Sequence, residues 1–294
     1  MQSTSARKPE HLRSTTQELK LAHSPDSDDA FMFYGLATKR VRTGSLRFSH
    51  VLEDIESLNQ KAASGAYDVT AISFHAYAYL ADRYILLPSG ASFGERYGPI
   101  VVAPKELGSQ GLKGKKVAIP GKLTTAALVL RLYEPEIETV TFPFDKIFER
   151  LMDGSADAGV IIHEGQLTYA RKGFRKIVDL GEWWHQTEHL PLPLGGNAIS
   201  RAIDAKTRSL VARMLKESID YGLSHREEAL EYAMQFSHGL DTPSADRFVS
   251  MYVNDRTLDY GERGRKAVQT LLDRGFERGL IPQQVQAEFV DSPS

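Results

Sequence analysis

The chain has 294 residues, of which 41% are hydrophobic and 25% charged, and its formal net charge is −2. This near balance, without a long basic or acidic block, argues against nucleic acid as a partner, so a small molecule is expected instead. The lack of cysteine excludes disulfides, thiolate metal sites and thiol nucleophiles.

The first twenty residues, MQSTSARKPEHLRSTTQELK, are polar and lack the apolar stretch of a secretory signal. No later segment has the roughly 18 uncharged apolar residues that a membrane span needs. We therefore expect a cytoplasmic protein without membrane association, either a monomer or a homodimer, in which residues 1–18 form a flexible leader.

From residue 19 onward the hydrophobic pattern alternates between the strand period and the helix period. Strands are predicted at residues 19–24, 46–54, 67–73 and 84–90, and helices at residues 28–40, 55–66 and 74–83. This alternation predicts a parallel sheet with helices on both faces.

A second α/β unit follows, and it gives way to a helical region after about Ser200. In this unit, strands are predicted at residues 98–104, 115–121, 137–144, 156–163 and 174–180, and helices at residues 124–134 and 144–154. The final region predicts helices at residues 205–224, 226–237, 244–255 and 264–279.

Two α/β units and a helical return are typical of a two-lobed solute-binding architecture. We expect an α/β fold of the type II periplasmic-binding-protein class, each lobe having a mixed, mostly parallel sheet flanked by helices. Lobe 1 would comprise residues 19–96 and 200–291, with the C-terminal helices packed on it, and lobe 2 residues 97–199. Ligands would lie between the lobes, at the C-terminal ends of strands.

His163 ends an apolar run, residues 158–162, that is typical of a strand buried on both faces. An imidazole at such a strand end could take a proton near pH 7, because its unperturbed pKa is about 6.5. Glu164 follows directly and could cap the next helix or reach the imidazole. A histidine that merely ends a strand is the alternative, and position alone favours it.

The segment Ser24-Pro25-Asp26-Ser27-Asp28-Asp29 joins the first predicted strand to the first helix. Ser24, Asp28 and Asp29 are candidates to line the cleft at the end of the strand. Acids at a helix start also satisfy free N–H groups and suit the helix dipole, so capping is an equally good interpretation.

The segment Pro120-Gly121-Lys122-Leu123-Thr124-Thr125-Ala126 is a second turn from strand to helix. Free backbone N–H groups and the hydroxyls of Thr124 and Thr125 could bind an anion or a hydroxyl group there. An ordinary threonine cap is the alternative. Ser73, the last residue of the strand predicted at residues 67–73, is a similar candidate for ligand binding, but its sequence signal is weaker.

Gly98-Pro99 and Leu194-Gly195-Gly196-Asn197 are expected to mark the crossings between lobes, so Gly98, Leu194 and Gly195 are candidate ligand contacts. Plain turn chemistry is the alternative that we favour for both stretches. His185 and His189 have the i, i+4 spacing of metal ligands, but the sequence HQTEH lacks the glutamate of zinc proteases. We expect an exposed loop or short helix there and no metal site.

In this order, these stretches resemble the 1,4-dihydroxy-6-naphthoate synthases of menaquinone biosynthesis. The similar stretches are Ser24-Pro25-x-x-Asp28-Asp29-x-Phe31, Val51-Leu52-Glu53-Asp54-Ile55-Glu56-x-Leu58-Asn59, Tyr97-Gly98-Pro99-Ile100-Val101-Val102, Pro120-Gly121-x-x-Thr124-Thr125-Ala126, Ile161-Ile162-His163-Glu164 and Leu190-Pro191-Leu192-Pro193-Leu194-Gly195. The resemblance extends from about Leu19 to about Gly279, and its most specific part is the Ile-Ile-His-Glu stretch followed by Leu-Pro-Leu-Pro-Leu-Gly.

The resemblance implies a lyase acting on cyclic dehypoxanthinyl futalosine, a carboxylate. A base removes a proton, a bond to the sugar-derived fragment breaks, and the carbocycle becomes an aromatic naphthoate, without a redox cofactor or metal. His163 matches the family's proposed base, whereas Ser73, Thr124 and Thr125 match pocket residues. Asp29 with Ser24 matches the N-terminal loop of the cleft.

The sequence departs from the family pattern in two places. The family loop more usually reads S-P-C-P-N-D-T-F, whereas Asp26, Ser27, Asp28 and Ala30 stand here, and Ala71 stands where lysine is common. Two other functions share the expected fold: a non-catalytic solute-binding protein for a small carboxylate, and a chorismate dehydratase of the same pathway. The histidine–glutamate pair argues against the dehydratase.

Overall fold

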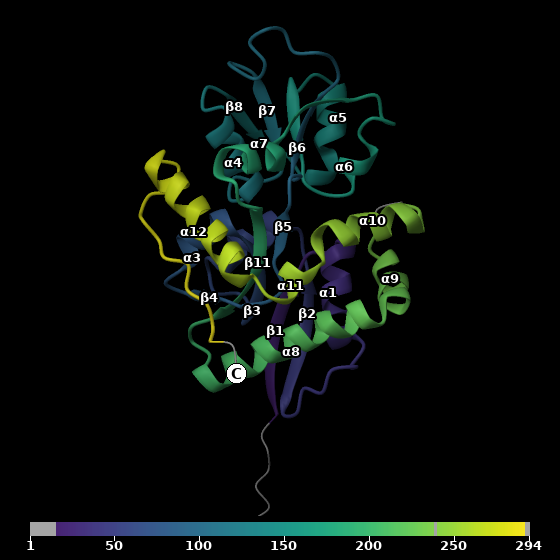
Figure 1. Ribbon diagram of the computed structural model, residues 1–294, viewed down its shortest axis with the longest axis vertical. Helices are drawn as coiled ribbons and strands as arrows, with labels where there is room; N and C mark the ends of the chain where they lie inside the picture. The colour runs from purple at the N-terminus through teal and green to yellow at the C-terminus, as the bar shows by residue number, and fades with distance from the viewer. Residues whose placement is uncertain (1–15, 238–239, 292–294) are drawn as a thin grey trace, which may run out of the picture.

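The computed structural model describes residues 16–237 and 240–291 and shows two α/β units stacked along the long axis of the molecule (Figure 1). Most of the leader predicted at residues 1–18 lies outside the described residues. Its last two residues belong to the first strand, which begins at Gln17.

The first unit contains a six-stranded sheet in the order β2-β1-β3-β11-β4, with β5 paired to β11. Its strands are β1 (Gln17–His23), β2 (Leu46–Leu52), β3 (Val69–Ser73), β4 (Tyr84–Leu86), β5 (Ser92–Gly94) and β11 (Leu192–Ser200). The β1–β2 and β1–β3 pairs are parallel, whereas β11 runs antiparallel to each of its neighbours.

Strand β11 corrects the expectation of a turn at Leu194–Asn197. These residues form backbone ladders with β3 and β5, so the chain already returns to the first sheet at Leu192 and not at residue 200. In the sequence Gly196 is typical of a turn. In the structure, a Cβ at this position would lie 2.3 Å from the Tyr260 hydroxyl. The glycine is needed for this close approach.

The second unit contains a five-stranded sheet in the order β10-β6-β9-β7-β8. Its strands are β6 (Ile100–Ala103), β7 (Lys116–Ile119), β8 (Glu138–Thr141), β9 (Ala158–Ile161) and β10 (Arg175–Asp179). The β7–β8 and β7–β9 pairs are parallel, and the β6–β9 and β6–β10 pairs are antiparallel. Both sheets are thus mixed, with at least as many antiparallel as parallel pairs.

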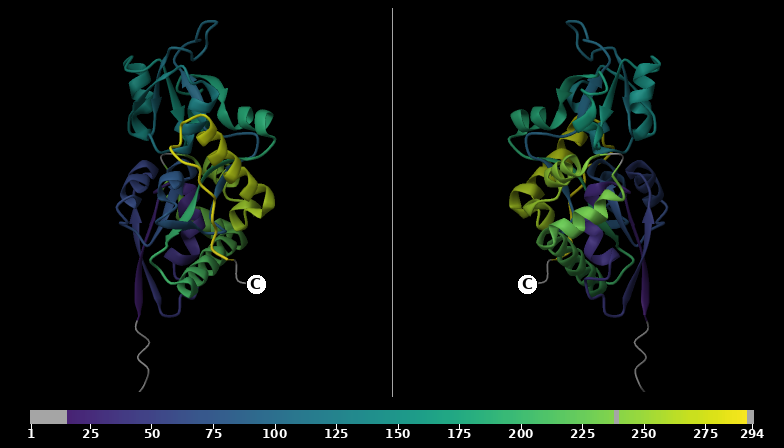
Figure 2. Two further views of the ribbon diagram at one scale, coloured as in Figure 1. Left: turned by 90° about the vertical axis from the view of Figure 1, so that its left-hand side faces the viewer. Right: turned by 90° about the vertical axis from the view of Figure 1, so that its right-hand side faces the viewer.

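The helices confirm most of the predicted periodicity. They are α1 (Ser27–Ala37), α2 (Ile55–Ala62), α3 (Phe74–Leu80), α4 (Thr125–Tyr133), the 3₁₀ helix η1 (Phe144–Lys146), α5 (Ile147–Met152), α6 (Gly165–Thr168), α7 (Leu180–Glu188), α8 (Ala205–Ser224), α9 (Arg226–Met234), α10 (Thr242–Tyr252), α11 (Asp255–Leu258) and α12 (Gly261–Glu277). The short elements α6, α11 and β5 had no clear sequence signal. The side views show α8 to α12 gathered on one side of the first unit (Figure 2).

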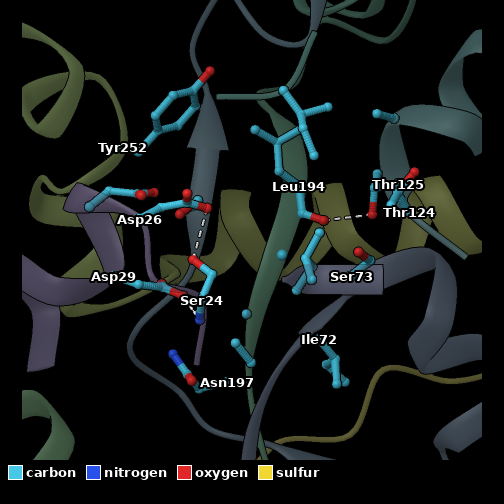
Figure 3. Close-up of a pocket in the computed structure, with 18 of the residues that line it drawn as sticks. Ser24, Asp26, Asp29, Ile72, Ser73, Thr124, Thr125, Leu194, Asn197 and Tyr252 are labelled. Atoms are coloured by element: carbon cyan, nitrogen blue, oxygen red, sulfur yellow. Dashed lines mark hydrogen bonds between the residues drawn. The ribbon is translucent and has the colours of Figure 1, made fainter. Parts of the chain in front are cut away.

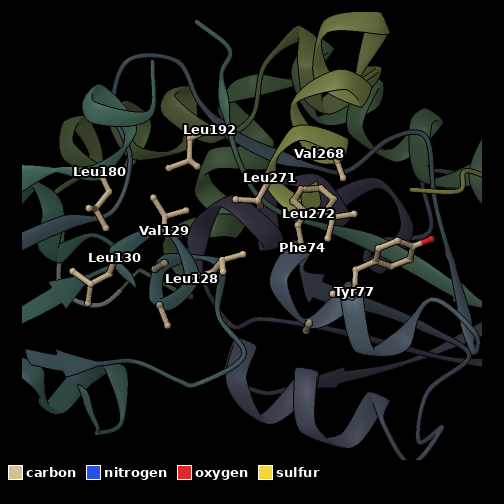
Figure 4. Close-up of a cluster of buried hydrophobic side chains, with 14 of the residues drawn as sticks. Phe74, Tyr77, Leu128, Val129, Leu130, Leu180, Leu192, Val268, Leu271 and Leu272 are labelled. Carbon is tan, nitrogen blue, oxygen red and sulfur yellow. The ribbon is translucent and has the colours of Figure 1, made fainter. Parts of the chain in front are cut away.

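A hydrophobic seam joins the two units on the side of α3 and α12. It is one cluster of buried side chains that includes Phe74 of α3, Leu128 of α4, Leu192 of β11 and Leu271 of α12 (Figure 4). The seam therefore contains residues of both units, because α4 follows β7 of the second sheet. A separate cluster, including Phe31 and Met214, packs α1 against α8 on the first sheet.

Among the described residues, no helix combines the length and the apolar character required to cross a bilayer.

Candidate functional site

A cavity lies where the two units meet on the side of α1 and α2, and it encloses about 790 Å³ of space between protein atoms, its open mouth included. It is lined by Ser24, Asp26, Asp28, Asp29, Ile55, Ala71, Ile72, Ser73, Gly90, Ser92, Pro99, Thr124, Thr125, Ala126, Ile162, Leu194, Gly195, Gly196, Asn197, Phe248 and Tyr252. In Figure 3 Asp26, Asp29 and Tyr252 lie on one side of β11, and Ser73, Thr124 and Thr125 lie on the other.

The acid loop, residues 24–29, connects β1 to α1 and is held by its own carboxylates. The Ser24 backbone N–H donates to Asp29 Oδ2 at 2.8 Å, and the Ser24 hydroxyl donates to Asp26 Oδ2 at 2.9 Å. Asp26 stands at the N-cap of α1 without a side-chain capping bond. These acids therefore fold the loop back on itself rather than cap the helix.

The crowding of the acid loop changes its protonation chemistry. Burial, followed by the charges of Asp29, Asp26 and Glu164, raises the pKa of Asp28 well above its ordinary value. Burial also raises the pKa of Asp29 to about 6, although the hydrogen bond from Ser24 opposes this shift. A proton is thus held in this part of the cavity at pH values where an exposed aspartate is ionised.

Ser73, at the C-terminal end of β3, is positioned by the fully buried Asn59 of α2. The Ser73 N–H donates to Asn59 Oδ1 at 2.9 Å, and Asn59 Nδ2 donates to Ser73 Oγ at 3.0 Å. Ser73, a candidate from the sequence, lines the cavity.

The α4 turn, residues 121–126, is held from the opposite unit by Glu56 of α2. The carboxylate of Glu56 accepts the N–H groups of Lys122 and Leu123, each at 3.1 Å. A Cβ at Gly121 would lie 2.2 Å from Glu56 Oε2, so only glycine leaves room for this carboxylate.

The hydroxyls of both threonines are already committed within the protein. Thr124 Oγ1 accepts the Ala127 N–H at 3.2 Å, which is the capping alternative considered for this turn, and donates to the Gly121 carbonyl at 2.9 Å. Thr125 Oγ1 donates to the Leu194 carbonyl at 2.5 Å. What the turn offers a ligand is its backbone, since Thr125 and Ala126 carry N–H groups that the first turn of an α-helix leaves unpaired.

His163 directly follows Ile162, which lines the cavity, but His163 itself is not one of the lining residues. Its Nδ1 accepts the Gly165 N–H at 3.1 Å, its Nε2 lies 3.4 Å from the Phe144 carbonyl, and its ring packs edge-on against the Phe144 ring. These contacts fit the neutral tautomer with the hydrogen on Nε2.

Two polar contacts tie the segment after His163 to the first unit. Ser27 of α1 donates to Glu164 Oε1 at 3.1 Å, and Tyr252 of α10 donates to Gln166 Oε1 at 2.9 Å. Together with the Glu56 and Thr125 contacts, they bring both units together around the cavity.

Most of the predicted site residues thus come together, namely Ser24, Asp28, Asp29, Ser73, Thr124, Thr125, Leu194 and Gly195. His163 and Glu164 lie next to the cavity, and Gly98 packs against Gly181 and Leu192 while its neighbour Pro99 lines the cavity.

Sequence reasoning missed Asn197, Phe248 and Tyr252 as lining residues. A buried asparagine inside an apolar strand, in NAIS, was an available signal for Asn197, whose Oδ1 is buried and has no donor among the described residues. The aromatic residues of α10 gave none, because their period also suits a core helix.

His185 and His189 lie at the C-terminal end of α7. His185 belongs to α7 and its Nε2 accepts from Arg96, whereas His189 follows the helix in the left-handed region. Residues 16–237 and 240–291 contain no cluster of three or more potential metal ligands.

Comparisons with known proteins show which sequences this chain is similar to. The family model described as "Menaquinone biosynthesis" matches residues 19–277. The 1,4-dihydroxy-6-naphthoate synthase of Thermus thermophilus is 38% identical over 274 residues, which cover 93% of this chain and all of that protein. The synthase of Streptomyces coelicolor is 34% identical, over 90% of this chain and 95% of that one.

Solved structures show the same fold. A crystal structure of a protein from Archaeoglobus fulgidus has a TM-score of 0.87 and 46% identity, covering 92% of this chain and all of that one. The alkanesulfonate-binding protein of Xanthomonas axonopodis, solved with MOPS, has a TM-score of 0.69 at 15% identity, covering 92% and 96% of the two chains. The second likeness shows the periplasmic-binding-protein fold alone.

Proposed function

Because the chain belongs to the menaquinone biosynthesis family, we propose that it is a 1,4-dihydroxy-6-naphthoate synthase that acts on cyclic dehypoxanthinyl futalosine. The observation that carries this proposal is the full-length similarity to two synthases, combined with a cavity at the junction of the two units. The enzyme would act as a carbon–carbon lyase.

The polarity of the cavity gives the substrate an orientation. Ser73 and the first N–H groups of α4 offer hydrogen-bond donors on one side of β11, which suits the carboxylate of the substrate. The acid loop and Asn197 offer acceptors on the other side, which suit the hydroxyls of the sugar-derived fragment. In this orientation Asp28 lies away from the substrate carboxylate.

We assign the proton abstraction to His163. Its Nδ1 lone pair accepts the Gly165 N–H in this structure, so the ring has to exchange this bond for the substrate proton. The side chain is 13% exposed, and it follows the cavity-lining residue Ile162 directly. Loss of the proton and of the sugar-derived fragment leaves an aromatic ring, which supplies driving force.

The contacts across the cavity explain how the site would exclude water. Ser27 to Glu164 and Tyr252 to Gln166 hold the His163 segment against the first unit. A substrate enclosed by both units reacts in a fixed geometry, which lowers the entropic part of the barrier.

The decisive experiment mixes the purified protein with cyclic dehypoxanthinyl futalosine and follows the naphthoate by absorbance and mass. The wild type is expected to form product, and His163→Ala is expected to lower kcat by about 10²- to 10⁴-fold because a positioned base contributes that much. His185→Ala is the matched control: a second partly buried histidine, on α7, whose loss is expected to leave turnover unchanged.

Three other outcomes would change the assignment. Full activity of His163→Ala would mean that the base lies elsewhere, with the cavity acid Asp28 the next residue to replace. Tight binding without turnover would indicate a solute-binding protein. Turnover of chorismate instead would indicate the dehydratase of the same pathway.

A further inference from the structure

Asn59 of α2 contacts the cavity-lining residue Ser73 and determines how the Ser73 hydroxyl can form hydrogen bonds. Asn59 is completely buried and makes both of its hydrogen bonds to one residue, Ser73. Its amide orientation is fixed by chemistry: the Ser73 backbone N–H is a donor, so the atom that faces it must be the oxygen Oδ1. The amide nitrogen Nδ2 must then face Ser73 Oγ.

This arrangement fixes the polarity of the Ser73 hydroxyl. An N–H group that points at Oγ makes the oxygen an acceptor, so the single hydroxyl hydrogen has to point in another direction. Ser73 stands at the N-cap of α3 but makes no side-chain capping bond there, and it lines the cavity (Figure 3). The direction left for the hydroxyl hydrogen is toward the cavity.

We propose that Asn59 is a positioning residue that commits the Ser73 hydroxyl to donate to an anionic oxygen of the ligand. The inference rests on the proposed function, because it takes that oxygen to belong to the substrate carboxylate. A hydroxyl that was free to rotate could accept from a ligand as well as donate to it. With Asn59 in place, this point of the cavity selects for an acceptor.

The same helix controls the neighbouring donors. Glu56 lies three residues before Asn59 on α2, and its carboxylate holds the N–H groups of Lys122 and Leu123 at the start of the α4 turn. One rigid element thus aligns a side-chain donor and the backbone donors of α4 on the same side of the cavity. Such a set of aligned donors recognises a carboxylate at little cost in ordering.

The test replaces Asn59 by a residue of the same shape and opposite hydrogen-bonding character. In Asn59→Asp, a carboxylate still accepts the Ser73 N–H but now also accepts the Ser73 hydroxyl hydrogen, which is thereby withdrawn from the ligand. We expect KM to rise roughly ten-fold or more with kcat little changed, because a bond to a charged group present in both ground and transition states is lost. Ser73→Ala is expected to show the same effect.

The double variant separates a positioning role from a structural one. If Asn59 acts through the hydroxyl, Asn59→Asp/Ser73→Ala has the KM of Ser73→Ala alone. If Asn59 only supports the fold, the two losses multiply, and that result overturns the proposal, as does an unchanged KM in Asn59→Asp. Asn254→Asp, the same change at the N-cap of α11, controls for added charge and is expected to behave as the wild type.

A binding measurement distinguishes this inference from the proposed function. The dissociation constant of 6-hydroxy-2-naphthoate, a fluorescent aromatic carboxylate, would be measured for the wild type, Asn59→Asp, Ser73→Ala and the double variant. If the wild type binds this probe without turning over the futalosine, the proposed function fails, and the pattern of the four affinities alone decides the role of Asn59. If the wild type neither turns over the substrate nor binds the probe, both proposals fall.

Discussion

The acid loop and the α4 turn both begin a helix that follows a parallel strand, and both line the cavity, but they are stabilised in different ways. In the α4 turn the polar groups pair with one another: Glu56 takes two N–H groups and each threonine hydroxyl takes a carbonyl. In the acid loop Asp26 and Asp29 accept from Ser24, but burial and mutual repulsion hold the pKa of Asp28 and of Asp29 above the ordinary range.

Because of this difference, the two regions should respond to different changes: one to added atoms, the other to pH. A region whose donors and acceptors are matched is sensitive to shape, because any added atom displaces a partner. A region that carries crowded carboxyls is sensitive to pH, since its stability depends on where its protons are. The following substitutions test this contrast.

The largest effect is expected from Gly121→Ala, which adds one methyl group to the α4 turn. Because the new Cβ would lie 2.2 Å from Glu56 Oε2, the carboxylate has to leave the Lys122 and Leu123 N–H groups. We expect the free energy of unfolding to fall by about 1–3 kcal/mol. Urea unfolding measures this loss, and KM is expected to rise as the donors of α4 lose their alignment.

The matched control for this change is Gly108→Ala, because a Cβ at Gly108 has nothing within 4 Å. Equal stability of the two variants would mean that the contact between Glu56 and the α4 turn contributes little.

A gain in stability is expected from Asp28→Asn, which restores the residue usual in the family loop. The amide removes a desolvated carboxyl from the neighbourhood of Asp29, Asp26 and Glu164. At pH 7 we expect the free energy of unfolding to rise by about 1 kcal/mol. Thermal and urea unfolding from pH 4 to pH 8 would measure it.

The direction of the pH dependence follows from the raised pKa of Asp28. A carboxyl whose pKa is higher in the folded state contributes its stability fully below the ordinary value of 3.8, and that stability is lost as pH rises through the folded pKa. The benefit of Asp28→Asn should therefore be large at neutral pH and shrink toward pH 4. A benefit independent of pH, or equal to that of the exposed control Asp82→Asn, would contradict this account of the acid loop.

The smallest effect on substrate binding is expected from Thr125→Val. The Thr125 hydroxyl donates its hydrogen bond to the Leu194 carbonyl. Its loss should therefore lower the free energy of unfolding by about 1 kcal/mol and leave KM within a few-fold of the wild type. Steady-state kinetics and urea unfolding measure both quantities. A ten-fold rise in KM without a loss of stability would show that the hydroxyl contacts the substrate, as the family resemblance implies.

The sequence predicted the local turns of the site better than the contacts between them. The acid loop, Ser73 and the α4 turn each follow a strand of clear period, and strand ends meet in a sheet. The partners of these turns are distant in sequence: Glu56 lies 66 residues from Lys122, and Ser27 lies 137 residues from Glu164. Periodicity reports which face a residue occupies and carries no information about such pairs.

The Leu194–Asn197 stretch shows a second limit. Two adjacent glycines are typical of a turn, and only the position of Tyr260 next to Gly196 reveals that small size, not flexibility, is required. From the sequence alone, without knowledge of that tertiary contact, this part of β11 is therefore predicted as a loop.

The hydrophobic seam also determines how the molecule comes apart. Because Phe74, Leu128 and Leu271 belong to one continuous cluster, neither unit can expose its part of the cluster while the other stays intact. Heating should therefore give one cooperative transition whose calorimetric and van't Hoff enthalpies agree, rather than two steps. A ligand that binds between the units would raise the melting temperature of the whole chain, so ligand screening by thermal shift needs no separate reporter for either half.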